Sequence, residues 1–199
     1  MKSDICRIEN GTRDLEAILK ESERVAEYNG LSHKQALRLR LLCEEMDGML
    51  PNIIDDFDGD FWIEYNEGVC RINAEIKIHE ITGTKKSELI SVAKNKKNAA
   101  AVGIVGKIRN AIENYFISEE TSIAVEAAAG SISFSTGFSD GVDYSAVWTL
   151  EKYRNAVNRD EQAEEWDELE KSVIASASDD VIVGVKGRQA TITIVKKFA

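Results

Sequence analysis

Proline is almost absent from this chain, since Pro51 is the only one in 199 residues. The sequence also contains no Pro/Ser-rich linker and no repeated unit. Domain boundaries usually fall in such linkers, because few contacts cross them. A chain of this length can bury one core of ordinary size. We therefore expect a single domain over residues 1–199.

Cysteine and histidine are also scarce. The three cysteines, Cys6, Cys43 and Cys70, are far apart, and with only His33 and His79 beside them they form no zinc-binding pattern. An odd number of separated cysteines is typical of reduced thiols. No apolar run approaches the ~18 residues of a membrane helix, and the N-terminus lacks the apolar stretch of a signal peptide. These absences predict a cytoplasmic protein that neither spans nor enters a membrane.

Positive charge is in deficit, because 35 acidic residues face 25 basic ones and the formal net charge is −10. Such a chain is repelled by phosphate backbones and by anionic lipid surfaces. We therefore expect no nucleic-acid or membrane partner.

The first third of the chain predicts a strand and two helices. Ile5–Ile8 alternates apolar and polar residues as a strand does, and Arg13–Asn29 has helical spacing with Thr12 as a plausible N-cap. Ser32 with Gln35 has the spacing of a capping box and starts a second helix. Pro51 is expected to end or bend this helix. Its apolar stripe is wide enough for a central core helix and consists of Ala36, Leu39, Leu42, Cys43, Met46, Met49 and Leu50.

Two β-hairpins are separated by more than eighty residues. The first covers Asp60–Ile78 with a turn at Asn66-Glu67-Gly68, and the second covers Val181–Phe198. A helix at Trp166–Ala177 precedes the second hairpin. We expect both hairpins to belong to one sheet. The segment between them predicts three helices, at Lys85–Ala93, at about Lys97–Phe116 and at Val147–Val157.

This order of elements resembles the anti-sigma-factor kinases of the histidine-kinase-type ATPase superfamily, which share their nucleotide fold with gyrase and the heat-shock chaperone ATPases. The resemblance covers roughly residues 1–78 and 164–198, and its best local part is the C-terminal ending. That ending is a helix, an acidic turn, two strands about a glycine turn, and a basic–aromatic close: Leu169–Ser178, Asp179-Asp180, Val181–Val185, Gly187, Ala190–Val195 and Lys196-Lys197-Phe198.

The resemblance implies a catalytic helix that carries Glu-x-x-x-Asn. One helical turn separates the two residues, so that both face the nucleotide. The Glu orients or deprotonates the attacking group, and the Asn holds the magnesium ion that bridges the phosphates of ATP. Glu44 stands at the Glu position, but Gly48 stands at the Asn position and has no ligand atom. Starting from Glu45 gives Met49 instead, and Asp47 could substitute only if it turns toward the site, about 100° around the helix.

The other nucleotide-binding motifs are also incomplete. The adenine-binding Asp-x-Gly-x-Gly should follow the second strand of the first hairpin, where Glu75 or Glu80 would replace the Asp and Gly83 is the one glycine present. The glycine-rich segment before the last helix should offer backbone N–H groups to phosphates. Residues 164–170 carry only carboxylates among their charged groups, and these would repel a triphosphate.

We therefore predict an α+β two-layer sandwich of the histidine-kinase/gyrase ATPase type. A mixed, mostly antiparallel sheet would carry helices on one face, with a core at about 1–78 and 164–198 and an enlarged helical insertion in the lid region at about 79–163. The expected function is a signalling module that binds a regulatory protein partner, with binding of ATP and Mg weak or lost. One alternative is an active ATP-dependent serine/threonine kinase or ATPase that uses Glu44. Another is a structural interaction domain, such as a homodimer, that never binds nucleotide.

Overall fold

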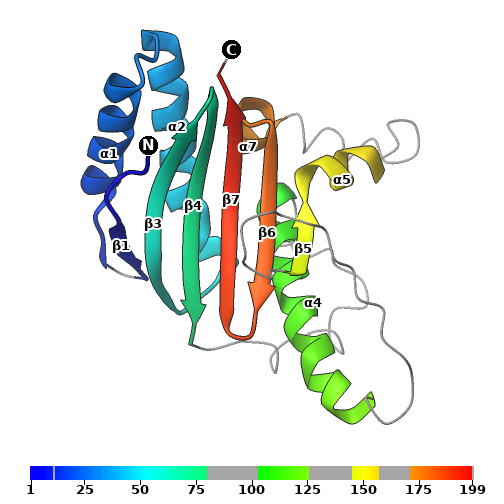
Figure 1. Cartoon of the computed structure of the whole chain (residues 1–199). Coiled ribbons are helices and arrows are strands. Elements are labelled where there is room, and N and C mark those ends of the chain that lie inside the picture. Colours follow the sequence, from blue (N-terminus) through cyan, green and yellow to red (C-terminus); the bar gives the residue numbers. More distant parts are fainter. Residues whose placement is uncertain (11, 80–102, 126–144, 157–170, 199) are drawn as a thin grey trace.

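Seven strands form one open sheet in the order β2-β1-β3-β4-β7-β6-β5 (Figure 1). The computed structural model describes residues 1–10, 12–79, 103–125, 145–156 and 171–198, with no side-chain detail for 12–13, 116–125 and 145–147. The strands are β1 (Cys6–Glu9), β2 (Thr12–Arg13), β3 (Phe57–Asn66), β4 (Val69–Ile78), β5 (Ser145–Thr149), β6 (Asp180–Lys186) and β7 (Gln189–Lys197). The helices are α1 (Leu15–Tyr28), α2 (His33–Ile53), α4 (Gly103–Val125), α5 (Leu150–Ala156) and α7 (Val173–Ala177).

The two hairpins join through β4 and β7, which pair from Val69↔Lys197 to Lys77↔Gln189. The expectation of one sheet is confirmed. The expectation of a mixed sheet is wrong for the described strands, because all their pairs are antiparallel. Three of these pairs connect neighbours in the chain through short turns, which can only produce antiparallel strands.

The turn of the first hairpin explains its register. Glu67 and Gly68 both have positive φ angles, 49° and 80°, between the paired residues Asn66 and Val69. Positive φ at both central residues defines the two-residue hairpin turn whose twist matches the strands. Gly68 also receives the end of the chain, because the N–H of Phe198 donates to its carbonyl oxygen at 2.7 Å.

One face of the sheet forms the core. In Figure 1, α2, α4 and α7 lie behind the sheet and α1 flanks α2, whereas β3, β4 and β7 carry no described helix on the side toward the viewer. Alternate residues of each strand point to the helices. The buried strand residues with apolar side chains are Ile8, Phe57, Phe61, Ile63, Cys70, Ile72, Ala74, Ile76, Ile78, Val181, Val183, Val185, Ala190, Ile192 and Ile194. The expected insertion contributes to the same body, because β5 pairs with β6 and Ile108 of α4 is fully buried.

The second helix begins as predicted, with the N–H of Ser32 donating to Oε1 of Gln35 at 2.8 Å. It continues past Pro51 to Ile53, where Asn52 Nδ2 donates to the Gly48 carbonyl at 3.1 Å. The prediction of Thr12 as the N-cap of the first helix is wrong. Thr12 pairs with Glu9 in β2, and the carboxylate of Asp14 caps the helix by accepting from the N–H of Ala17 at 3.0 Å.

The predicted helix at Val147–Val157 is wrong in its first residues. Ser145–Thr149 is the edge strand β5, as its β-branched and aromatic residues favour, and the helix starts only after Thr149, whose hydroxyl accepts from the N–H of Lys152 at 3.2 Å. The helix expected at Lys97–Phe116 is present as α4 from Gly103 and extends to Val125. The helix predicted at Lys85–Ala93 lies outside the described residues. Of Trp166–Ala177, the described part contains α7, which Ser172 caps. None of the helices in the described ranges is both long and apolar enough to cross a bilayer.

Two glycines give a matched test of this packing. A Cβ on Gly59 would lie 2.2 Å from the Glu75 carbonyl oxygen, whereas a Cβ on Gly48 would meet no atom within 4 Å. We expect Gly59→Ala to lower the free energy of unfolding by about 1–3 kcal/mol, as overpacking does. Gly48→Ala should raise it by up to about 1 kcal/mol through helix propensity. Urea denaturation measures both, and equal effects of the two substitutions would contradict the described packing of β3 on β4.

Candidate functional site

Glu44, the residue at the catalytic position of the resemblance, belongs to an ion-pair network between α1 and α2. Its Oε1 lies 3.2 Å from Arg40 Nε, and Arg40 Nη1 lies 2.5 Å from Glu23 Oε1 on α1. The side chain is therefore turned toward α1 and is partly exposed. The carboxylate of Glu44 is thus already engaged by the guanidinium of Arg40.

The other α2 candidates point in different directions. Asp47 is only 4% exposed and lies on the buried side of the helix. Gly48 lies on the solvent side, and Glu45 is half-buried about 100° around the helix from Glu44. These four positions on α2 thus do not converge on one site.

The sheet separates Glu75 from these residues. Ala74 and Ile76 are fully buried toward the helices, so Glu75 between them points to the opposite face of β4. Gly83 lies outside the described residues. Among the residues described, the structure therefore does not bring the predicted nucleotide-binding set together.

An open cleft of about 890 Å³ lies between the N-terminal segment and α1. It is lined by four carboxylates and three cations, together with Ile5, Cys6 and Ala17. The charged residues are Asp4, Glu9, Asp14 and Glu21, and Arg7, Lys20 and Arg24. The strand β1 forms one wall and the first turns of α1 form the other.

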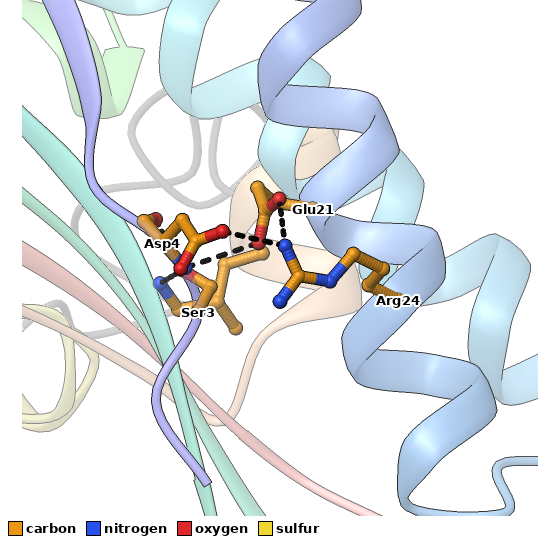
Figure 2. A network of polar contacts seen from close by, with 5 residues as sticks. Ser3, Asp4, Glu21 and Arg24 are labelled. Carbon is orange, nitrogen blue, oxygen red and sulfur yellow. Dashed lines mark hydrogen bonds and ion pairs between the residues drawn. The ribbon is translucent and has the colours of Figure 1, made fainter.

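Glu21 is the centre of the cleft's polar network (Figure 2). It is only 7% exposed. One carboxylate oxygen accepts from the N–H of Asp4 at 3.1 Å, and the other accepts from Arg24 Nη1 at 2.7 Å. The same guanidinium nitrogen donates to Asp4 Oδ2 at 2.7 Å. A buried carboxylate is stable only when it is paired in this way, so the network fixes the N-terminal segment on α1.

The N-terminal segment is held on its other side by β3. The N–H of Ser3 donates to the Ile63 carbonyl at 2.8 Å, and the N–H of Ile63 donates to Ser3 Oγ at 2.9 Å. The terminal ammonium group of Met1 donates to the Tyr65 carbonyl at 2.7 Å. One wall of the cleft is thus an extension of the sheet rather than a loose tail.

The thiol of Cys6 in the cleft and the buried thiols of Cys43 and Cys70 are all held in their protonated form. Burial raises the pKa of Cys6, and the carboxylates of Glu21, Asp14 and Asp4 raise it further. Burial raises the pKa of Cys70 to about 12, and it raises the pKa of Cys43 well above its ordinary value. A protonated thiol is a poor nucleophile, so none of the three is prepared for catalysis.

A second polar cluster lies near the start of β3, where this strand pairs with β1. Arg7 is paired with Asp58 and with Asp60, the latter at 2.9 Å, and His79 Nε2 lies 2.5 Å from Asp58 Oδ1. Arg7 thus bridges the two carboxylates of this cluster. Within the described ranges, no group of three His, Cys, Asp or Glu residues could hold a metal ion.

The comparisons with known proteins give no relative. No family model matches the chain, no curated protein matches it, and no solved structure matches it.

Sequence reasoning missed Glu21 and Arg24. A signal was present, because Glu21 lies three residues after Ile18 and four before Val25, both fully buried. A carboxylate within the apolar stripe of a helix must find a partner when that face is buried. The partner, Asp4, could not be predicted from spacing.

We expect Glu21→Gln to lower the free energy of unfolding by about 1–3 kcal/mol, because it weakens a charge-assisted network under partial burial. Amide exchange of Asp4 should accelerate. Glu27→Gln is the control on the same helix, where the side chain is exposed, and it should leave both quantities unchanged. Equal effects of the two variants would show that the network does not hold the N-terminal segment.

Alkylation of the three cysteines tests the burial and the raised pKa of their thiols. At about pH 8, where an ordinary cysteine is partly ionised, native protein should react slowly with iodoacetamide at Cys6 and not measurably at Cys43 or Cys70. Unfolding should expose all three. Glu21→Gln should speed the reaction of Cys6, since Glu21 is the strongest charge that raises its pKa. Fast labelling of Cys70 in the native state would contradict the described burial.

Proposed function

We propose that this protein is a regulatory module that binds a protein partner and that binds nucleotide weakly or not at all. The order of its elements supports the resemblance to anti-sigma-factor kinases, since the early and late hairpins lie in one sheet against α2. The observation that carries the proposal is the charge and shape of the cleft beside β1.

The cleft is unsuited to a triphosphate. Carboxylates exceed cations by one among its lining residues, and two of the three cations are already engaged. Arg24 is paired with Asp4 and Glu21, and Arg7 is paired with Asp58 and Asp60. Charges of mixed sign with one sign slightly in excess favour a polypeptide over a polyanion.

The walls of the cleft fit an extended segment of a partner. On its outer side, β1 pairs with the two-residue β2 only at Ile8 and Glu9, so the edge from Cys6 toward the N-terminus borders the cleft. Exposed sheet edges bind extended peptides through main-chain hydrogen bonds. Ile5, at 59% exposure, adds an apolar contact, and Lys20 and Glu9 line the cleft with one charge of each sign.

The alternative of an active kinase or ATPase would need Glu44 as the base. Its pairing with Arg40 and the absence of a side chain at Gly48 count against that alternative. A thermal-shift titration with ATP and magnesium distinguishes the two, since a ligand of the native state raises Tm by mass action. We expect no shift at millimolar ATP. A shift that Glu44→Ala abolishes and Glu27→Ala preserves would overturn the proposal in favour of the enzyme.

Site-specific photo-crosslinking tests the partner. Benzoylphenylalanine at Ile5 should give one protein adduct in the native host, whereas the same group at Lys186, on β6 at a distance of several strands, should not. Lys20→Glu should weaken the Ile5 adduct. Identical adducts from both positions, or none from Ile5, would contradict binding at the cleft.

A further inference from the structure

The solvent side of α2 carries an apolar strip. Leu37 is 53% exposed and Leu41 is 38% exposed. Gly48 lies on the same side, where an added Cβ would meet no atom within 4 Å. Positions 37, 41 and 48 fall within about 40° of one another around a helix. A contiguous exposed apolar surface is one of the features that mark a protein–protein contact.

The charges beside this strip are segregated along the helix. Lys34 and Arg38 lie in its first half and Glu45 in its second half, all on the same flank of the strip by helical spacing. None of the three forms an ion pair with another described residue. Glu44, on the other flank, is already paired with Arg40.

This arrangement is complementary to itself in one orientation. Arg38 and Glu45 are separated by seven residues, or two helical turns, so they occupy equivalent positions on the helix surface. When two copies of a helix pack antiparallel about a two-fold axis, each flank meets the same flank of its partner. Arg38 then faces the partner's Glu45, and Glu45 faces the partner's Arg38. A parallel pair would instead bring opposite flanks together and leave both charges unmatched.

We propose that α2 docks on α2 of a second copy of this chain, antiparallel, with Leu41 close to the two-fold axis. Such an interface is isologous, so one patch serves both partners. The Gly48 surface allows the partner's helix to approach closely, since no side chain stands there. This inference does not depend on the proposed function, because no residue of α2 lines the cleft beside β1.

Charge exchange tests the pairing in the full chain. Sedimentation equilibrium should give a dimer for the unchanged protein. Arg38→Glu and Glu45→Lys should each weaken dimerisation at least about tenfold, since each places two like-charge contacts in the interface and 1.4 kcal/mol corresponds to a factor of ten. Lys186→Glu, on β6, is the control and should leave the dissociation constant unchanged.

Mixing the two variants gives the decisive result. In a heterodimer of Arg38→Glu with Glu45→Lys, both flanking contacts again join opposite charges. We expect the equal mixture to recover the dimerisation that each variant weakens alone, and the double variant R38E/E45K to recover it as well. A monomeric unchanged protein, or variants that dimerise as before, would overturn the proposal. Leu41→Asp should also give monomers, with circular dichroism showing that the exposed substitution leaves the fold intact.

Discussion

The rest of this structure depends on the antiparallel pairing of β4 with β7. It joins residues 69–77 to residues 189–197 and so brings the end of the chain onto the first hairpin. The buried faces of both strands, including Ile72, Ile76 and Ile192, supply the floor on which α2 packs. Loop-closure entropy rises only with the logarithm of the intervening length. The many residues between the two hairpins therefore add little to the entropy cost of pairing β4 with β7.

Much of this fold was predictable because its strongest signals are local. The hairpin turn at Glu67-Gly68 and the start of α2 at Ser32 depend on a few adjacent residues and appear as expected. The wrong assignments occur where pairing with another segment of the chain decides the secondary structure. Thr12 is drawn into β2 by pairing with Glu9, and Ser145–Thr149 becomes a strand because β6 offers an edge there. Local propensity alone cannot show whether such a partner exists.

For the candidate site too, the placement of some residues could be predicted from the sequence and the placement of others could not. The strict alternation of β4 already placed Glu75 opposite Ile76 on the strand, so its separation from α2 could have been derived from parity alone. The apolar stripe of α2 already indicated which side of the helix meets the core, and its central residues Leu42 and Met46 are fully buried. The stripe could not show that Glu44 pairs with Arg40 and that Arg40 also pairs with Glu23 on α1. The Glu21 network joins the N-terminal segment to α1. The apolar neighbours of Glu21 indicate that this carboxylate needs a partner, but no spacing in the sequence identifies Asp4 as that partner.

Gly48 leaves α2 without a ligand atom at the position of the family's Asn, and it also leaves an open surface at that point of the helix. A glycine inside a helix is destabilising by about 1 kcal/mol relative to alanine, and here no neighbour in the described part of the chain would collide with a Cβ. The packing described within one copy therefore gives no reason for a glycine at this position. The missing side chain removes the oxygen that could hold a metal ion in a nucleotide site, and at the same point it leaves the outer surface of α2 flat. A second helix that lies across this surface would supply the reason, because close approach of backbones is what a glycine permits and an asparagine prevents.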